Sequence, residues 1–507
     1  MSKKNNKRIA KNTVALYFRM IFLMAVNLYT SRVILDSLGV DDYGIYNVVG
    51  GFVSLFALIS ATLSSACSRF LNFEMGKGDI NRQNVVFSTA VTIQWVLAII
   101  VFFLAEIVGV WYVNNVMVLP GERLSAANWC FQFSVFNFCM NLITVPYNAS
   151  IIAHEKMKTF AYVSIFQGLA ILAISFLVYW NPFDRLVFYA LMLLIVQFTV
   201  RYIYQVYCRK HFEECIYRKH FDKQLLKQML TFSMWHLVSN GAFVVKTHGV
   251  NIVLNLFWGP AINAAKGIAN QVEAAVNQFS ENFIMALNPQ ITQSYAKGNV
   301  EYTMQLTYKG ARLAFYMVYL VALPIVLNAE QIIGIWLKEV PDYTVIFTQL
   351  TMISMLVRCL SRTMIKAQNA TGKVRNFQLV EGLIIFFNLP VSFVVLQLGC
   401  DAYAVVIVAI IMEVAALSAR IYMLPHTIPE FSRSRFFKSV ILRCSLVSIL
   451  PYLCALYIKN LLSDGFIFCI LCVLACIFLT ILFVYCLGLE IAERRMIRSK
   501  IKLIIKR

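Results

Sequence analysis

Charge is scarce in this chain of 507 residues. Only 14% of its residues are charged and 60% are hydrophobic, whereas a soluble domain has about 25% charged and about 45–50% apolar residues. No stretch is polar for long enough to form a soluble domain. The composition therefore excludes a string of soluble domains and predicts one membrane-embedded unit.

The sequence also lacks the short motifs of common hydrolases. It has no Walker A sequence, no HExxH and no GxSxG, so nothing in it indicates ATP hydrolysis, a zinc protease or a serine hydrolase. The adjacent Asp41 and Asp42 lie in GVDDYG, a composition typical of a turn. We predict that the chain is not an enzyme and uses no cofactor, although a membrane glycan polymerase would also lack familiar motifs.

The thirteen cysteines do not have the spacing of a metal or redox site. The CxxC formed by Cys469 and Cys472 lies in an apolar run without a nearby histidine. We interpret these cysteines as small hydrophobic residues and expect no metal site.

Long apolar runs fill the chain instead. Spanning a bilayer takes about 20 largely apolar residues, and this criterion predicts about fourteen transmembrane helices in an all-α membrane protein. Their expected ranges are 13–38, 44–74, 84–112, 125–153, 159–181, 186–208, 228–257, 261–292, 307–337, 344–368, 376–398, 402–424, 438–459 and 465–488. The basic N-terminus MSKKNNKRIAK precedes an apolar run that is too long for a signal peptide and has no cleavage site, so we expect an uncleaved first helix.

The net charge of +20 would suit a nucleic-acid partner, but its distribution indicates a membrane topology. Most lysines and arginines fall in alternate loops, and the outer loops hold only Arg123, Arg185, Lys338 and Lys459. The positive-inside rule therefore places both termini in the cytoplasm. We expect no nucleic-acid partner, and we expect the basic tail, residues 489–507, to lie on anionic membrane lipids.

Weak internal similarity divides most of the chain into two halves. A shift of 220 residues lays Lys77 and Gly78 on Lys297 and Gly298, and a shift of 217 lays AHEKMKTF (153–160) on ATGKVRNF (370–377). Both shifts displace the chain by an even number of helices, which predicts two parallel six-helix lobes, as in some transporters. The expected organisation is a basic cytoplasmic N-terminus at 1–12, an N-lobe at 13–210, a cytoplasmic linker at 211–227, a C-lobe at 228–425, a final helix pair at 438–488 and the tail at 489–507.

Polar residues inside the predicted spans are candidates for a functional site. A charge at a helix centre costs about 2.5–3.5 kcal/mol and therefore usually faces a cavity or a partner. The predicted helix 261–292 has one polar face, whose residues recur at spacings of three and four: Asn263, Lys266, Asn270, Glu273, Asn277 and Ser280 or Glu281. We expect this face to form the wall of a hydrated cavity, with a Lys266–Glu273 pair that holds helices together as the alternative.

Other spans carry isolated polar residues. Lys246 lies near the middle of helix 228–257, and the 217-residue shift lays Asn141 on Arg358. Arg19 lies near one end of the first span, where snorkelling to the interface explains it as well as function does. We expect polar faces from the two lobes to meet at a water-filled interface.

Three segments of the chain carry a family resemblance: SRVILDSLGVDDYGIYNVVGG (31–51), RFLNFEMGKGD (69–79) and VPYNASIIAHEKMKTFAYVSI (145–165). They resemble bacterial polysaccharide or O-antigen flippases of the multidrug/oligosaccharidyl-lipid/polysaccharide (MOP) exporter superfamily. The resemblance implies a MATE-like fold of two six-helix lobes around a central cavity, followed here by an extra C-terminal helix pair. It also implies that the protein lies in the bacterial inner membrane.

In that family a cationic cavity receives the pyrophosphate of a polyprenyl-linked oligosaccharide. By cavity helix and residue type, the resemblance nominates Arg19, Lys246, Lys266 and Arg358, together with Asn141 and Asn270, as substrate-binding residues. Glu273 departs from a purely basic lining, so it is either neutralised in a pair or involved in coupling to H⁺ or Na⁺.

The leading hypothesis is therefore a flippase for a lipid-linked oligosaccharide. It predicts that neutralising Lys246 or Arg358 abolishes surface glycan and leaves protein abundance intact. The alternatives are a cation-coupled multidrug exporter, which would favour an acidic and aromatic cavity, and a membrane glycan polymerase, which would require larger outer loops.

Overall fold

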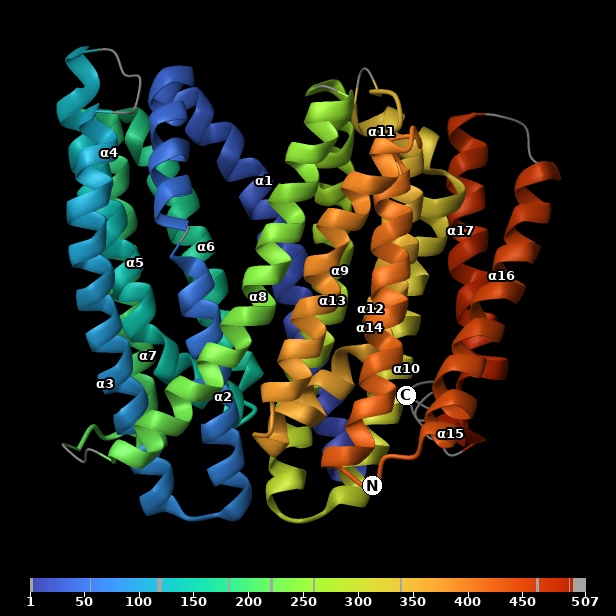
Figure 1. Ribbon diagram of the computed structural model, residues 1–507. Helices are drawn as coiled ribbons and strands as arrows, with labels where there is room; N and C mark the ends of the chain where they lie inside the picture. The colour runs from blue at the N-terminus through green and yellow to red at the C-terminus, as the bar shows by residue number, and fades with distance from the viewer. Residues whose placement is uncertain are drawn as a thin grey trace, which may run out of the picture. The chain divides into compact units, whose positions relative to one another are not determined.

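The computed structural model is all helical in the part of the chain that it describes, which is residues 3–495 except 55, 116–120, 181–182, 219–221, 259, 338–339, 462–464 and 492. The α-helices follow the chain in this order (Figure 1): α1 Lys3–Ser54, α2 Ala57–Lys77, α3 Ile80–Leu104, α4 Val110–Asn115, α5 Leu124–Ala153, α6 Met157–Trp180, α7 Arg185–His211, α8 Lys223–Trp258, α9 Pro260–Ala296, α10 Val300–Leu327, α11 Ala329–Trp336, α12 Thr344–Thr371, α13 Arg375–Gln397, α14 Ala404–Thr427, α15 Arg433–Phe436, α16 Leu442–Leu461 and α17 Phe466–Phe483. Most of the predicted basic tail, residues 496–507, lies outside the described residues.

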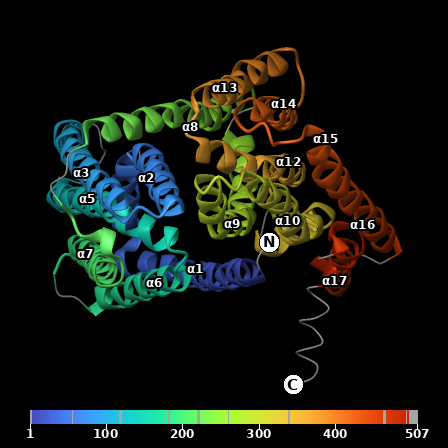
Figure 2. The same cartoon turned by 90° about the horizontal axis from the view of Figure 1, so that it is seen from below.

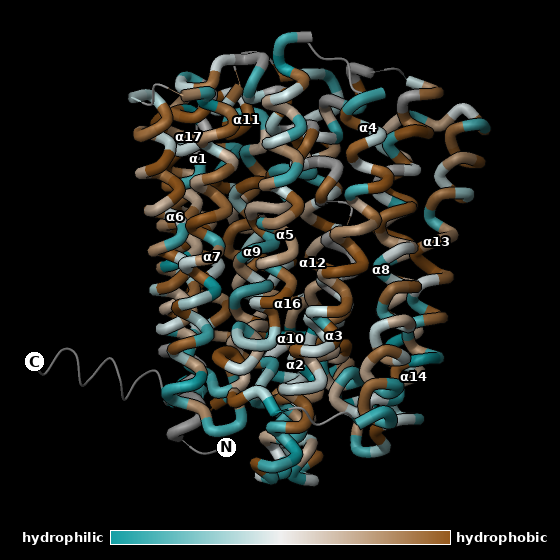
Figure 3. Tube along the Cα trace, turned by 90° about the vertical axis from the view of Figure 1, so that its left-hand side faces the viewer, coloured by the Kyte–Doolittle hydropathy of each residue, from teal (hydrophilic) through white to brown (hydrophobic). Residues whose placement is uncertain are grey.

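Eleven helical segments among the described residues are long and apolar enough to cross a membrane. Figure 3 shows hydrophobic residues along these helices and hydrophilic residues concentrated toward their ends. The predicted spans 44–74, 228–257 and 261–292 are not among the eleven, although α2, α8 and α9 form long helices there. The polar residues in these three spans lower the mean hydropathy of the spans. The chain is thus a multi-pass membrane protein, and the number of fourteen crossings stays a prediction.

Helix α1 is interrupted at Gly39, the first residue of the expected turn at 39–44, and the remaining residues of that turn are helical. Gly39 has φ 78° and ψ 171°, and the helical segment after it runs to Ser54. A residue with a Cβ rarely adopts this conformation, so glycine allows the kink without a loop. The predicted second span is consequently divided between the end of α1 and α2, which begins at Ala57.

The chain forms two compact units. The first comprises Met1–Leu237 and Thr292–Gly298. Within it α1 packs along α6, and α5 packs against α3 and α7. Its largest fully buried side chains include Phe87, Phe131 and Leu142. These side chains form the interior of the first unit on α3 and α5.

Arg123 joins three segments of the first unit. Arg123 donates from Nε to Asp42 Oδ1 at 2.8 Å and from Nη1 to Asp184 Oδ2 at 2.6 Å. Burial alone would lower the pKa of the Arg123 guanidinium, but the hydrogen bonds and charges of the two carboxylates raise that pKa above its ordinary value. Asp42 therefore has a structural partner, in agreement with a turn role.

The second unit comprises Val238–Ile291 and Asn299–Arg507. One core joins α8, α9, α12, α13 and α14 through buried residues such as Leu254, Ala265 and Phe347. A second core joins α9, α10 and α12 around Val276 and Met355. The final helices α16 and α17 lie side by side next to α10 (Figure 2).

Two turns related by the 220-residue shift have the same local structure. Gly78 has φ 82° and Gly298 has φ 74°, the left-handed conformation that ends many helices. The next residues, Asp79 and Asn299, then cap the following helices by accepting hydrogen bonds from backbone N–H groups three residues on, at 3.0 and 3.2 Å. The local geometry thus repeats where the sequences match.

Positions related by the 217-residue shift also share their backbone conformation. The shift lays Glu155 on Gly372, and both residues have positive φ, 56° and 75° respectively. Glu155 is one of only two non-glycine residues with positive φ in the described chain. Since such a conformation is uncommon outside glycine, the coincidence supports an internal repeat at these positions.

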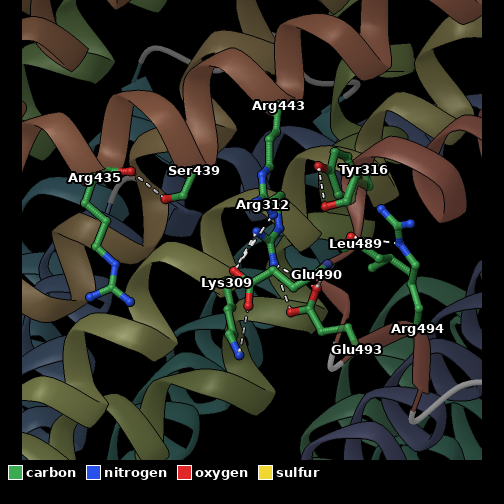
Figure 4. Close-up of polar contacts among 11 residues, drawn as sticks. Lys309, Arg312, Tyr316, Arg435, Ser439, Arg443, Leu489, Glu490, Glu493 and Arg494 are labelled. Atoms are coloured by element: carbon green, nitrogen blue, oxygen red, sulfur yellow. Dashed lines mark hydrogen bonds and ion pairs between the residues drawn. The ribbon is translucent and has the colours of Figure 1, made fainter.

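The C-terminal cluster joins the segment after α17 to the rest of the second unit. It consists of Lys309, Arg312, Arg443, Glu490 and Glu493 (Figure 4). Arg312 lies at its centre with 1% of its surface exposed. Its Nη1 donates to Glu490 Oε1 at 3.1 Å and its Nη2 to Glu493 Oε2 at 2.8 Å. Both carboxylates follow α17, so the pairs fix that segment against α10.

Candidate functional site

A cavity of about 310 Å³ lies inside the second unit. Its wall comes from α8, α9, α12, α13 and α14. The charged residues of the wall are Lys246, Lys266, Glu273 and Arg358. The neutral polar ones are Thr247, Asn251, Asn270, Asn277, Thr351, Ser354 and Asn388, and the apolar ones are Phe243, Val250, Ala274, Val405, Val406 and Ala409. Charged and polar groups that converge in a concave wall are typical of a ligand site.

Helix periodicity explains why α9 supplies so much of this wall. Lys266, Asn270, Glu273 and Asn277 follow one another at spacings of four, three and four, so they share one face. The adjacent face of α9 buries Ala265, Ala269 and Val276 in the cores described above. The structure thus places the predicted polar face of α9 on a cavity.

Two of the three cations in the wall are paired with carboxylates from other helices. Arg358 on α12 forms an ion pair with Glu273 on α9. Lys246 on α8 lies 3.8 Å from Glu413 on α14, measured from Nζ to Oε1. The alternative Lys266–Glu273 pair is therefore wrong, because Glu273 pairs with Arg358. These pairs link four helices around the cavity and offset the cost of burying their charges.

Lys266 differs from the other two cations. Its Nζ donates to Asn270 Oδ1 at 2.9 Å and to Thr351 Oγ1 at 3.4 Å. Both acceptors are neutral, and among the described carboxylates none forms an ion pair with Lys266. Lys266 is thus a lysine on a cavity wall whose charge is solvated by an amide and a hydroxyl.

The first unit contains the two remaining predicted site residues. Arg19 on α1 donates from Nη1 to Ser164 Oγ at 3.3 Å, and its guanidinium lies 4.4 Å above the Phe160 ring. It therefore packs against α6. Asn141 is an exposed residue of α5. Their role as substrate ligands stays a prediction.

Several polar residues at the site were not predicted from the sequence, among them Asn388 in the wall and Glu413, the partner of Lys246. Glu413 is an isolated acidic residue in an apolar span, and its position gave no indication of Lys246 as its partner. Asn388 is a single amide in the apolar run IIFFNLP. A lone polar residue of this kind is a recognisable signal, because an amide inside a membrane helix usually has a partner or a function.

Comparisons with known proteins identify the fold. A MATE transporter in the straight conformation aligns with a TM-score of 0.70 and 13% identity over 86% of this chain and 97% of its own. The MATE transporter ClbM in complex with Rb⁺ aligns with a TM-score of 0.68 and 15% identity over 84% of this chain and 96% of its own. A MOP superfamily transporter from Pyrococcus furiosus aligns with a TM-score of 0.64 and 14% identity over 84% of this chain and 96% of its own. These likenesses confirm the predicted fold class. No curated protein matches the sequence at a significant level.

Family membership follows from the sequence itself. Residues 7–295 match the family described as polysaccharide biosynthesis protein. The match covers more than half of the chain and includes the three segments on which the resemblance was based. It confirms that resemblance, and the chain belongs to the polysaccharide biosynthesis protein family, with the fold of the MOP superfamily transporters.

Proposed function

We propose that the protein moves a polyprenyl-pyrophosphate-linked oligosaccharide, the precursor of a surface polysaccharide such as O-antigen or capsule, across the bacterial inner membrane by alternating access. An anionic headgroup with polar sugars must cross about 30 Å of hydrocarbon. Leaving it unsolvated there is prohibitively costly. A basic, hydrated cavity solves this problem while the lipid tail stays in the bilayer.

The single observation that carries this proposal is Lys266. The wall of the cavity has three cations and one carboxylate, Glu273. Glu273 and Glu413 neutralise Arg358 and Lys246, whereas the hydrogen-bond partners of Lys266 among the described residues are neutral. An anionic phosphate would give Lys266 the charge-assisted hydrogen bonds that it lacks. The cavity therefore favours an anion over the cationic drugs expected of a multidrug exporter.

The Arg358–Glu273 pair offers a route for ion coupling. If Glu273 takes up H⁺ or binds Na⁺, Arg358 loses its partner and becomes available to the substrate. Release of the ion restores the pair and expels the anion. In this scheme Glu273 couples ion binding to substrate transport. Arg358 binds the substrate in only one half of the cycle, while Lys266 binds it throughout.

The test is transport by the purified protein in proteoliposomes with a labelled saccharide on polyprenyl pyrophosphate. Wild-type protein is expected to move the label across the bilayer, and Lys266→Gln to do so roughly tenfold to a hundredfold more slowly, since a hydrogen bond to a charged group contributes about 1.5–3 kcal/mol. Lys266→Arg should retain most of the rate. Lys309→Gln, which removes a lysine outside the cavity, is the matched control.

Two results would count against the proposal. If wild-type vesicles transport no lipid-linked saccharide, the substrate class is wrong. If Lys266→Gln transports normally while the substrate class is right, Lys266 is not the phosphate ligand.

A further inference from the structure

An open groove lies in the first unit at the ends of two helices that are long and apolar enough to span a membrane. Its volume is about 890 Å³, and its lining comes from α1 and α6. The candidate spans on these helices are Asn12–Gly39 and Met157–Trp180, and both of their last residues line the groove. The groove therefore lies where spanning helices leave the hydrocarbon and meet the headgroups of the bilayer.

Contacts between α1 and α6 hold the two sides of this groove together. The Ser37 hydroxyl oxygen lies 3.3 Å from the Ser175 carbonyl oxygen, and the centroids of the Tyr29 and Phe176 rings are 6.1 Å apart. Arg185, the first residue of α7, donates from Nη1 to the Ser37 carbonyl oxygen at 3.0 Å. The shape of the groove is thus set by packing between helices.

Aromatic side chains form the apolar part of the lining. Phe176, Tyr179 and Trp180 follow one another at spacings of three and one, so they lie on one side of α6. All three are exposed, as is Tyr29 on α1, and Trp180 exposes 83% of its surface. Tyrosine and tryptophan are enriched at membrane–water interfaces, where their rings lie at the level of the headgroups. The lining therefore favours a membrane lipid as the occupant over a soluble molecule.

Two exposed residues of opposite charge, Arg32 and Asp36, line the groove beside these rings. They are four positions apart on α1, so they are neighbours on one face with Cβ atoms about 5–6 Å apart. An ion pair with each other is the ordinary role of such residues. Among the described residues, however, neither of them forms an ion pair or a side-chain hydrogen bond. One cation and one anion are thus available to a ligand that carries both charges.

We propose that this groove binds phosphatidylethanolamine. The lipid phosphate accepts hydrogen bonds from the Arg32 guanidinium, the ammonium donates to the Asp36 carboxylate, and the glycerol and the upper acyl chains contact the rings of Tyr29 and Trp180. Phosphate and ammonium are joined by a two-carbon linker, which suits side chains on successive turns of one helix. Phosphatidylcholine has no N–H for Asp36, and phosphatidylglycerol has no ammonium. The site is independent of the substrate that the protein transports.

The experiment is native mass spectrometry of the purified full-length protein in detergent. The protein is mixed with equal amounts of phosphatidylethanolamine, phosphatidylcholine and phosphatidylglycerol that have the same acyl chains. Wild type is expected to bind phosphatidylethanolamine about tenfold more tightly than the other two, the factor that one charge-assisted hydrogen bond supplies. Asp36→Asn should bind phosphatidylethanolamine and phosphatidylcholine equally, because it removes the partner of the ammonium. Arg32→Gln should weaken all three lipids.

The matched control is Glu122→Gln. Glu122 is another exposed acidic residue of the first unit, but it is not part of the groove lining, so its replacement should keep the preference. Thermal unfolding gives a second readout. In lipid-free detergent Arg32→Gln and Asp36→Asn should unfold at the wild-type temperature, because both side chains are exposed. Added phosphatidylethanolamine should raise the midpoint of wild type more than that of Asp36→Asn.

Equal binding of the three lipids by wild type, or an undiminished preference in Asp36→Asn, overturns the inference and makes the rings an unselective membrane anchor. Tighter binding of phosphatidylglycerol than of phosphatidylethanolamine also overturns it, in favour of a simple anionic-lipid contact through Arg32. If Arg32→Gln binds all three lipids as wild type does, Arg32 does not hold the phosphate and the inference is wrong. None of these outcomes affects the proposed function, because the mixture contains no saccharide.

Discussion

Replacing Arg358 by glutamine is expected to reduce the amount of folded protein and to lower its stability by about 3–5 kcal/mol, the cost of removing one partner of a buried ion pair. Glu273 would remain in the cavity wall without its cation. The measurement is the yield of monodisperse protein on size-exclusion chromatography in detergent, together with its thermal midpoint. This revises the sequence-based prediction that neutral Arg358 variants keep normal abundance.

The double variant Glu273→Gln/Arg358→Gln separates folding from function. It removes both charges, so no uncompensated charge remains, and it should recover most of the stability that the single variant loses. Its transport rate then shows whether the ion pair is needed to couple ion binding to substrate transport. If Arg358→Gln alone is as stable as wild type, the ion pair does not contribute to folding and our interpretation of the pair is wrong.

The second large effect is expected in the C-terminal cluster. Arg312→Gln should lower stability by about 3 kcal/mol, because it leaves two carboxylates without their shared buried cation. Arg312 reaches both Glu490 and Glu493 from α10, and its side chain is almost fully buried (Figure 4). Thermal unfolding in detergent measures the loss. Limited proteolysis of the C-terminal segment, with release expected in the variant, measures its local cause.

Lys309→Gln is the control for this prediction. Lys309 pairs with Glu490 at 3.6 Å, but its side chain is 24% exposed, and such an ion pair contributes about 1 kcal/mol or less. The control should therefore unfold close to the wild-type temperature. Equal losses in Arg312→Gln and Lys309→Gln would show that the cluster acts through net charge and not through the buried guanidinium.

Low pH should reduce the stability that Arg312 contributes to the fold. Burial alone raises the pKa of the Glu490 carboxyl, but the charge and hydrogen bond of Arg312 outweigh burial and hold this pKa below its ordinary value. A carboxylate with a lowered folded-state pKa stabilises the fold above its unfolded pKa of about 4.3, and this contribution disappears as the pH falls through the folded pKa. The stability difference between wild type and Arg312→Gln should therefore shrink below about pH 4.

Local sequence predicted the faces of the site helices well. The three- and four-residue spacing from Lys266 to Asn277 places these residues on one face of any α-helix, and the structure has that face on a cavity. The isolated charges Lys246 and Arg358 were recognisable because membrane helices rarely carry them. Asn388 is also a polar residue in an apolar span, but it was harder to recognise as a site residue, because a neutral amide costs less to bury than a charge.

Sequence alone could not assign partners. Glu273 is seven residues from Lys266 on the same helix, yet its partner is Arg358, 85 positions away. Arg312 and Glu493 are 181 positions apart. Helix periodicity determines which residues share a face, but the rotation of each helix against its neighbours determines which charges meet.

The sequence by itself therefore determined the membrane-embedded, all-helical class, the faces of the helices and the family, because a bilayer requires long apolar helices whose backbone hydrogen bonds are satisfied internally. Only the tertiary structure decided that Arg358 and Lys246 are neutralised, and that among the described residues Lys266 pairs with no carboxylate and the buried Asn388 amide has no hydrogen-bond partner. Those distinctions depend on packing between helices distant in the chain, where positions of a few ångströms decide whether a buried charge has a partner.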